Sequence, residues 1–153
     1  MANTYTQIHI QFVFAVKGRS SLISNKWKED LFRYITGIVQ MNEHKMLQIN
    51  GMPDHIHILI GMRPKQSISD LMQEVKGSSS KWINANKLVV GKFAWQEGYG
   101  AFSYSKDQVP RVIKYIRDQE EHHKTVGFRE EYLELLKEMG VEYDERYLFE
   151  PVQ

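Results

Sequence analysis

The amino-acid sequence predicts an α+β fold in which one antiparallel sheet packs against helices. The chain of 153 residues is 42% hydrophobic and 25% charged, which is typical of a globular domain rather than of a disordered chain. Segments with a two-residue hydrophobic period alternate along the chain with segments of helical period. No stretch has the composition of a linker, so we expect a single domain over residues 1–153.

The first half has the order strand, helix, strand, strand. Residues 5–16 alternate between apolar and polar side chains, which predicts a half-buried strand. A helix is expected from about residue 24 to about residue 42, because apolar side chains recur there at helical spacing. Residues 45–50 and 55–60 are expected to form two further strands, joined by the turn-rich segment 51–54.

The second half adds a helix, a strand and two more helices. A helix over residues 67–85 and a strand over 94–105 complete the β-α-β-β-α-β order of a ferredoxin-like sheet. Ser105 and Gln108 fit a capping box that begins the next helix, and Gly140 ends the last one. Core helices cover one sheet face, so the added helices, a partner subunit or a ligand must cover the other. The expected parts are a core at about 5–105, a helix at about 106–124, and a last helix with its tail at about 128–153.

The sequence also excludes several classes of site and location. It contains no cysteine, which excludes disulfides, thiolate zinc sites and cysteine nucleophiles. Residues 1–7 lack the pattern of a signal peptide, and no run approaches the roughly 20 apolar residues of a spanning helix, so we expect a cytoplasmic protein. Residues 1–116 carry 15 Lys and Arg against 8 Asp and Glu, whereas residues 117–153 carry 5 against 11. A basic body fits phosphate binding, and fits a solvated surface equally well.

The most informative motif is a pair of histidines in the strand expected at 55–60. Alternate side chains of a strand share a face, so His55, His57 and Leu59 lie together, opposite the isoleucines between them. The isoleucines match a core beneath the helices. Two neighbouring imidazoles have the spacing needed to share a metal ion or to bind phosphate. A structural role for both histidines remains the alternative when this motif is taken alone.

A polar stripe runs along the helix expected at 106–124. Tyr115 and Gln119 are four residues apart, which places them one turn apart on the same side of a helix. A tyrosine beside glutamine and arginine is not where a core aromatic would lie, although a surface tyrosine is the alternative. The whole stripe consists of Gln108, Arg111, Tyr115, Gln119 and His122.

Together the two motifs indicate phosphoryl transfer. Two imidazoles and the amide oxygen of Gln119 make a three-ligand site for a divalent metal ion, with open positions for phosphate and water. A phenol is a weak nucleophile at its free pKa of about 10, and a neighbouring cation stabilises its anion. A phosphotyrosine formed by Tyr115 would conserve bond energy, so that a DNA strand could be rejoined without ATP.

These motifs resemble those of the single-tyrosine transposases of small bacterial insertion sequences and their REP-associated relatives. That family belongs to the His-hydrophobe-His (HUH) endonuclease superfamily. The resemblance extends from Tyr5 to about Met139. It is carried by Pro53-Asp54-His55-Ile56-His57-Ile58-Leu59-Ile60, by residues 76–84 and 93–103, by Tyr115-Ile116-Arg117-Asp118-Gln119 and by Glu120-Glu121-His122-His123-Lys124.

The resemblance implies a DNA transposase that is a ferredoxin-like homodimer. Such a protein binds hairpins in single-stranded DNA at the ends of a mobile element. His55, His57 and Gln119 would bind Mg²⁺ or Mn²⁺, and Tyr115 would form a 5′-phosphotyrosine link that leaves a free 3′-OH. In this family the tyrosine helix can complete the site of the other subunit, and the sequence leaves open whether Tyr115 acts in its own chain.

Five further side chains are candidates for DNA contact. Arg111, Lys114, Lys76 and Lys81 fit phosphate contacts, and His9 lies on a polar strand face. Each fits a solvent-exposed role as well. Two alternative functions remain open: a relaxase-like or replication-initiator-like nicking enzyme, whose chains are usually longer, and a domesticated hairpin-binding protein, which has no need of a nucleophile.

Overall fold

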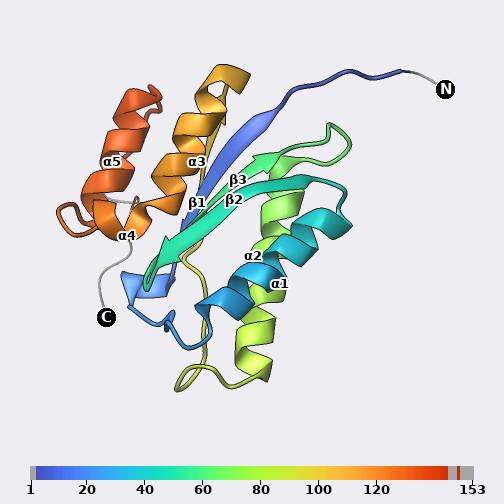
Figure 1. Cartoon of the computed structure of the whole chain (residues 1–153). Helices are drawn as coiled ribbons and strands as arrows, with labels where there is room; N and C mark the ends of the chain where they lie inside the picture. The colour runs from blue at the N-terminus through green and yellow to red at the C-terminus, as the bar shows by residue number, and fades with distance from the viewer. Residues whose placement is uncertain (1–2, 145–147, 149–153) are drawn as a thin grey trace.

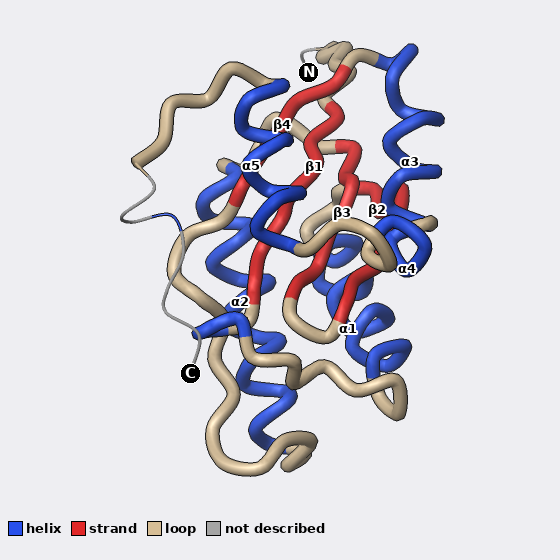
Figure 2. The backbone as a smooth tube through the Cα atoms, turned by 90° about the vertical axis from the view of Figure 1, so that its left-hand side faces the viewer, coloured by secondary structure: helices blue, strands red, loops and turns tan. Residues whose placement is uncertain are grey.

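The computed structural model describes residues 3–144 and residue 148, and it has the predicted α+β architecture. Four antiparallel strands form one sheet in the order β2-β3-β1-β4, the arrangement of a ferredoxin-like core. Helices α1 and α2 cover one face of the sheet, and α3, α4 and α5 cover the other (Figures 1 and 2). The elements are β1 (His9–Ala15), η1 (Lys17–Arg19), α1 (Lys28–Met41), β2 (Lys45–Met52), β3 (His55–Gly61), α2 (Ile68–Ala85), β4 (Gly100–Tyr104), η2 (Lys106–Gln108), α3 (Val109–Arg117), α4 (Gln119–His122) and α5 (Phe128–Glu138).

The alternation of the central strands decides which side chains lie on each face of the sheet. Strand β1 pairs with β3 on one side and with β4 on the other. Since side chains alternate along a strand, His55, His57 and Leu59 of β3 point toward α3–α5. The opposite set packs in the core under α1 and α2, as predicted, and includes Ile8, Ile10, Phe12, Phe14, Val16, Ile56, Ile58 and Ile60.

Side-chain caps begin two of the helices, and the one at Ser105 is predicted from the sequence. The hydroxyl of Ser67 accepts a hydrogen bond from the backbone N–H of Asp70 at 3.0 Å, which caps α2. The backbone N–H of Ser105 donates to Oε1 of Gln108 at 2.9 Å, as expected of the capping box before α3. These caps fix where each helix begins relative to the sheet.

The strand expected over residues 94–105 is shorter than predicted. It is confined to β4, and only an isolated bridge at Trp95 precedes it. Gly98 has a φ of 82°, which interrupts an extended backbone. The ammonium of Lys76 donates hydrogen bonds to the carbonyl oxygens of Gln96 and Gly98 at 2.7 and 2.6 Å, and so holds this segment against α2 as a loop.

The helix expected over residues 106–124 is not continuous, which corrects the prediction. It divides into η2, α3 and α4, and the break between the last two is at Asp118, whose φ and ψ are −93° and 23°. The carbonyl of Arg117 accepts a hydrogen bond from Nδ2 of Asn50 at 2.9 Å instead of continuing the helical ladder. Tyr115 therefore belongs to α3 and Gln119 to α4.

The second face of the sheet is covered by the added helices, which was one of the three expected possibilities. Val112 and Ile116 of α3 pack on Leu59 of β3. Helix α5 packs on β1 and β4 through Phe128, Leu135 and Leu136, which join Val13, Ala15 and Phe102 in one cluster. In the tail, Tyr143 and Leu148 pack against this cluster, while residues 145–147 and 149–153 lie outside the described residues. No helix in the described part of the chain is long and apolar enough to cross a membrane.

Candidate metal and nucleophile site

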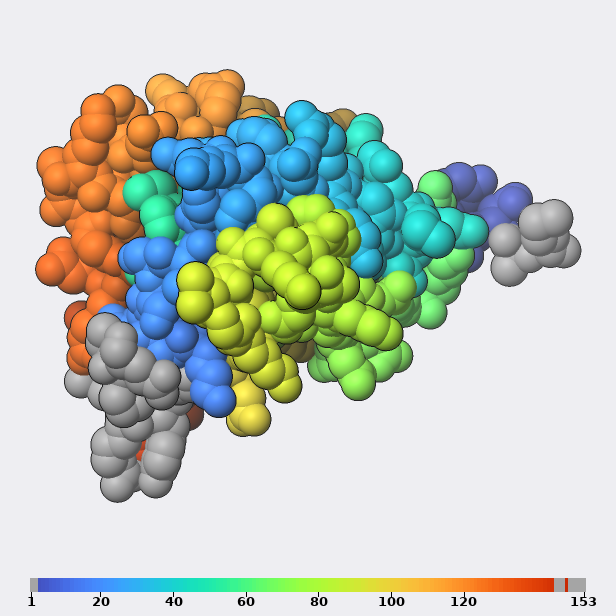
Figure 3. Space-filling view, turned by 90° about the horizontal axis from the view of Figure 1, so that it is seen from below, coloured from blue at the N-terminus to red at the C-terminus, as the bar shows by residue number. Residues whose placement is uncertain are grey.

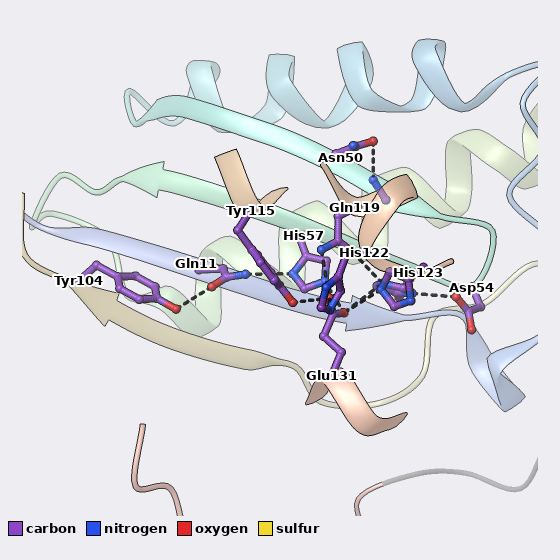
Figure 4. Close-up of polar contacts among 12 residues, drawn as sticks. Gln11, Asn50, Asp54, His57, Tyr104, Tyr115, Gln119, His122, His123 and Glu131 are labelled. Atoms are coloured by element: carbon purple, nitrogen blue, oxygen red, sulfur yellow. Dashed lines mark hydrogen bonds and ion pairs between the residues drawn. The ribbon is translucent and has the colours of Figure 1, made fainter. Parts of the chain in front are cut away.

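The two sequence motifs meet on the sheet face covered by α3, α4 and α5 (Figure 4). His55 and His57 are completely buried there. The ring of Tyr115 stands edge-on to the ring of His57, with centroids 5.8 Å apart. Nε2 of His55 donates to Oε1 of Gln119 at 3.2 Å. The structure therefore brings all four predicted residues together in one chain.

The carboxylate of Glu131, on α5, lies at the centre of this cluster (Figure 4). Its Oε1 atom accepts a hydrogen bond from Nε2 of His57 at 2.8 Å and is 3.3 Å from Nε2 of His55. Its Oε2 atom accepts hydrogen bonds from the hydroxyl of Tyr115 and, at 3.0 Å, from Nε2 of Gln119. One carboxylate thus contacts every residue that the sequence assigned to the site.

Two adjacent histidines of the α4 segment also face Glu131. Nε2 of His123 is 3.1 Å from Oε1, and Nε2 of His122 is 3.3 Å from Oε2. Both nitrogens are buried and make no hydrogen bond within the described residues. The sequence analysis placed His122 on the polar stripe but assigned neither histidine to the metal site, and the structure places both beside it.

Side chains behind the two strand histidines fix their orientation. Nδ1 of His55 donates to Oδ1 of Asp54 at 2.7 Å, which leaves Nε2 directed into the cluster. Nε2 of Gln11 donates to Nδ1 of His57 at 2.9 Å, and Oε1 of Gln11 accepts from the hydroxyl of Tyr104 at 2.8 Å. In this amide orientation Nε2 of His57 carries the proton that it shares with Glu131. The reversed amide would place that proton on Nδ1 and free Nε2 for a metal.

Burial and charge oppose each other at these groups. Burial lowers the pKa of His55, but its interactions with Asp54 and Glu131 outweigh burial and raise the pKa to about 9. Burial lowers the pKa of His57. Burial alone would raise the pKa of Glu131, but the surrounding histidines hold it well below its ordinary value. Burial and the charge of Glu131 raise the pKa of Tyr115 above 10, so the phenol is neutral in the metal-free protein.

The donor set fits a divalent metal ion. The ligand atoms of His55, His57 and Glu131 lie within 4.8 Å of one another, and so do those of His122, His123 and Glu131. Nε2 of His55 faces two oxygen atoms, those of Gln119 and Glu131, which only a proton or a cation can bridge. Imidazole and carboxylate together are common ligands of divalent ions. This histidine–glutamate cluster is therefore a candidate metal site.

The five DNA-contact candidates lie in three separate places. Arg111 lines a cleft of about 250 Å³ together with Tyr115 and Glu131, and Lys114 is exposed on the same helix. Lys76 and Lys81 are on α2, which covers the face of the sheet opposite α3–α5 (Figure 1) and faces the viewer in Figure 3. His9 lines a separate cavity of about 520 Å³. Of these three places, the cleft beside Tyr115 adjoins the histidine–glutamate cluster, because Glu131 also lines it.

Glu131, Gln11 and Asp54 are the site residues that sequence reasoning missed. A signal for Glu131 was present: it lies three residues after Phe128 and four before Leu135, on the apolar stripe of α5, where a lone charge needs a partner. Asp54 was assigned to a turn and to the motif of the family resemblance, but not to the site. Gln11 lies on the polar face of its strand, which does not distinguish it from a solvent-exposed side chain.

Comparisons with known proteins point to one family. The family described as "Transposase IS200 like" matches residues 4–119. The chain is 24% identical over 118 residues to the ISDra2 transposase TnpA of Deinococcus radiodurans, covering 74% of this chain and 84% of that protein. It is also 24% identical over 129 residues to the transposase for insertion sequence element IS200 of Salmonella typhimurium, covering 81% of this chain and 84% of that protein.

Two solved structures share the fold. One is the crystal structure of a protein from Deinococcus radiodurans R1 described as a transposase. It has a TM-score of 0.62 and 22% identity, and the match covers 78% of this chain and 96% of that one. The other is a REP-associated tyrosine transposase bound to a REP hairpin. It has a TM-score of 0.61 and 15% identity, and the match covers 82% of this chain and 74% of that one.

Proposed function

Because the chain belongs to the IS200-like transposase family, a family of tyrosine HUH nucleases, we propose that it cleaves and rejoins single-stranded DNA through Tyr115. One observation carries this proposal: Tyr115 and the histidine pair of β3 converge on one buried carboxylate beside an open cleft. In the proposed reaction Oη of Tyr115 forms a bond to phosphorus and the bond from phosphorus to the 3′ oxygen breaks. The products are a 5′-phosphotyrosine and a free 3′-OH, which receives the proton.

His55, His57 and Gln119 are the proposed ligands of Mg²⁺ or Mn²⁺. When bound, the ion supplies positive charge that stabilises the phenolate and the phosphate oxygens. The protein itself holds the nucleophile in place, because the hydroxyl of Tyr115 donates to Oε2 of Glu131.

The proposed substrate is a hairpin in single-stranded DNA at the end of a mobile element. Support comes from the shared fold of the REP-associated transposase bound to a REP hairpin. Arg111 is proposed as a phosphate contact beside Tyr115, because both line the same cleft. Lys114, Lys81 and His9 are proposed as further contacts along a longer strand, and Lys76 would join them only by leaving the carbonyl oxygens of Gln96 and Gly98.

The subunit arrangement is also part of the proposal. A homodimer is expected from the family. The 5.8 Å between the rings of Tyr115 and His57 in one chain supports a site in which Tyr115 acts on its own histidines. Mixing a Tyr115→Phe chain with a His57→Ala chain tests this directly: a site built from one chain gives no cleavage, whereas a composite site restores it.

The polarity of cleavage tests the reaction. A hairpin with a single-stranded flank is labelled either 5′ or 3′ of the scissile phosphate and incubated with the protein and Mn²⁺. The label on the 3′ side should migrate with the protein in a denaturing gel, and the label on the 5′ side should appear as a free strand ending in 3′-OH. Hairpin binding with no cleavage under either label would instead favour the non-catalytic hairpin-binding alternative.

A further inference from the structure

Glu131 is a charged residue in an apolar position. It lies on the face of α5 that also carries Phe128 and Leu135, and its side chain is only 1% exposed. An ionised carboxylate at such a depth is strongly unfavourable unless nearby groups compensate its charge. Its neighbour Glu130 on the same helix is exposed. The surroundings of Glu131 must therefore explain its burial.

Three imidazole nitrogens converge on a single oxygen of this carboxylate. Nε2 of His57, His123 and His55 lie 2.8, 3.1 and 3.3 Å from Oε1. The side chain of His123 is 6% exposed, and its Nε2 makes no hydrogen bond within the described residues. Protons alone could satisfy this arrangement only if every Nε2 carried one. A single cation could instead be bound by these nitrogens and by Oε1 together, since imidazole and carboxylate are both common ligands of divalent ions.

We propose that Glu131 is itself a ligand of the divalent ion that His55 and His57 bind. The proposed ligands are then two imidazoles, the amide oxygen of Gln119 and one carboxylate, and α5 of the same chain completes the centre. A cation at the meeting point of these donors replaces the Nε2 protons and neutralises the buried carboxylate at once. The inference rests on the metal-dependent function proposed above. Glu131 lies beyond residue 119, where the match to the family ends.

The second oxygen of the Glu131 carboxylate contacts residues on the nucleophile side of the site. Oε2 contacts the hydroxyl of Tyr115 and the amide of Gln119, while Oε1 faces the histidines. A single side chain therefore connects the cation to the nucleophile. Helix α5 then contributes to the reaction centre and also packs on the sheet.

Ion selectivity distinguishes a ligand from a side chain that only holds the histidines in place. Carboxylate oxygens suit Mg²⁺ and Mn²⁺, whereas imidazoles suit Ni²⁺ and Zn²⁺. Mn²⁺ and Ni²⁺ binding are measured separately by calorimetry on the full chain, with Mn²⁺ also followed by electron paramagnetic resonance. The matched control for Glu131→Gln is Glu130→Gln, the same change one residue away on the exposed side of α5.

The expected result is a loss of Mn²⁺ affinity of at least about tenfold in Glu131→Gln, since even groups behind the ligands contribute that much. Ni²⁺ affinity should fall much less, and Glu130→Gln should bind both ions as the unchanged protein does. Equal losses for the two ions would show a structural role and overturn the proposal. Unchanged Mn²⁺ binding in Glu131→Gln would overturn it as well.

A His57→Ala chain separates this inference from the function on which it rests. If the unchanged protein binds Mn²⁺ and His57→Ala does not, the metal centre stands, and Glu131→Gln then decides the ligand question. If His57→Ala binds Mn²⁺ normally, the proposed centre itself is wrong. Should Glu131→Gln fail to fold, anomalous diffraction from Mn²⁺-grown crystals of the unchanged protein replaces it. The ion should lie within about 2.6 Å of a Glu131 oxygen, the range of direct coordination of a hard divalent cation by oxygen, and an ion farther than that from both oxygens overturns the proposal.

Discussion

Tyr115 on α3 meets His57 on β3 edge-on, with ring centroids 5.8 Å apart, although 58 positions separate the two residues in the sequence. The contact is held by packing on both sides of it. Val112 and Ile116 lie on either side of Tyr115 in the helix sequence. Both are buried against Leu59, which is two residues after His57. The distance between Tyr115 and the strand that carries His55 and His57 is therefore set by a small apolar cluster.

Replacing His57 by alanine should abolish DNA cleavage and leave hairpin binding largely intact. The change also costs about 1–3 kcal/mol of stability, because Gln11 and Glu131 lose a buried hydrogen-bond partner. His44→Ala is the matched control. His44 is also buried, is hydrogen-bonded to Gln66 and to the backbone N–H of Arg63, and does not line the cleft beside Tyr115. Thermal unfolding should show losses in both variants, and only His57→Ala should lose cleavage; loss of hairpin binding in His57→Ala would indicate a structural role instead.

Asp54→Asn should weaken metal binding by about 10–100-fold, the usual effect of removing a carboxylate that orients a histidine ligand. The carboxylate of Asp54 accepts a hydrogen bond from Nδ1–H of His55, which raises the basicity of Nε2. Calorimetric titration with Mn²⁺ measures the effect, and Asp107→Asn on the exposed turn before α3 serves as the control. Equal affinities for Asp54→Asn and the unchanged protein would remove His55 from the ligand set.

Metal affinity should also increase with pH. The pKa of His55 is raised to about 9 in the metal-free protein, so a cation must displace a proton at neutral pH. Below that pKa the proton competes, and the apparent association constant should rise by about tenfold per pH unit between pH 6 and pH 8. Titrations in buffers of different ionisation enthalpy should show about one proton released at pH 7. Affinity that does not change over this range would mean that His55 is already neutral.

Gly51 should tolerate no side chain, because it lies against the strand that carries the histidines. A Cβ atom there would be 2.5 Å from the backbone oxygen of His55 and 2.7 Å from the side chain of Ile56. Gly51→Ala should lower the free energy of unfolding by about 1–3 kcal/mol and reduce cleavage. Gly61→Ala, on the same sheet but with its nearest contact at 3.6 Å, should behave like the unchanged protein. Similar denaturation midpoints for the two variants would contradict this.

The fold was predictable wherever local periodicity decides the structure. Alternation alone placed His55 and His57 on the face opposite Ile56 and Ile58, and the sheet has that arrangement. The capping box at Ser105 was also predictable, because it depends on two residues three apart.

What the sequence could not predict depends on contacts between distant segments. The break before Gln119 is associated with a hydrogen bond from Asn50 to Arg117, 67 residues apart. The loop before β4 is held by Lys76, 20 and 22 residues away from the carbonyls that it contacts. Glu131 joins the site only because α5 folds back over β1, which no period in the sequence indicates.

If Tyr115 is the nucleophile, the protein must form a covalent adduct with DNA through this residue, and the adduct can be detected directly. The protein is incubated with a labelled single-stranded hairpin and Mg²⁺ or Mn²⁺, then resolved on a denaturing gel. The unchanged protein should give an adduct that a chelator prevents, and Tyr34→Phe, on the opposite helix layer where Tyr34 stacks on Trp82, should give the same amount. Tyr115→Phe should give none. An adduct of normal yield in Tyr115→Phe would show that another residue is the nucleophile.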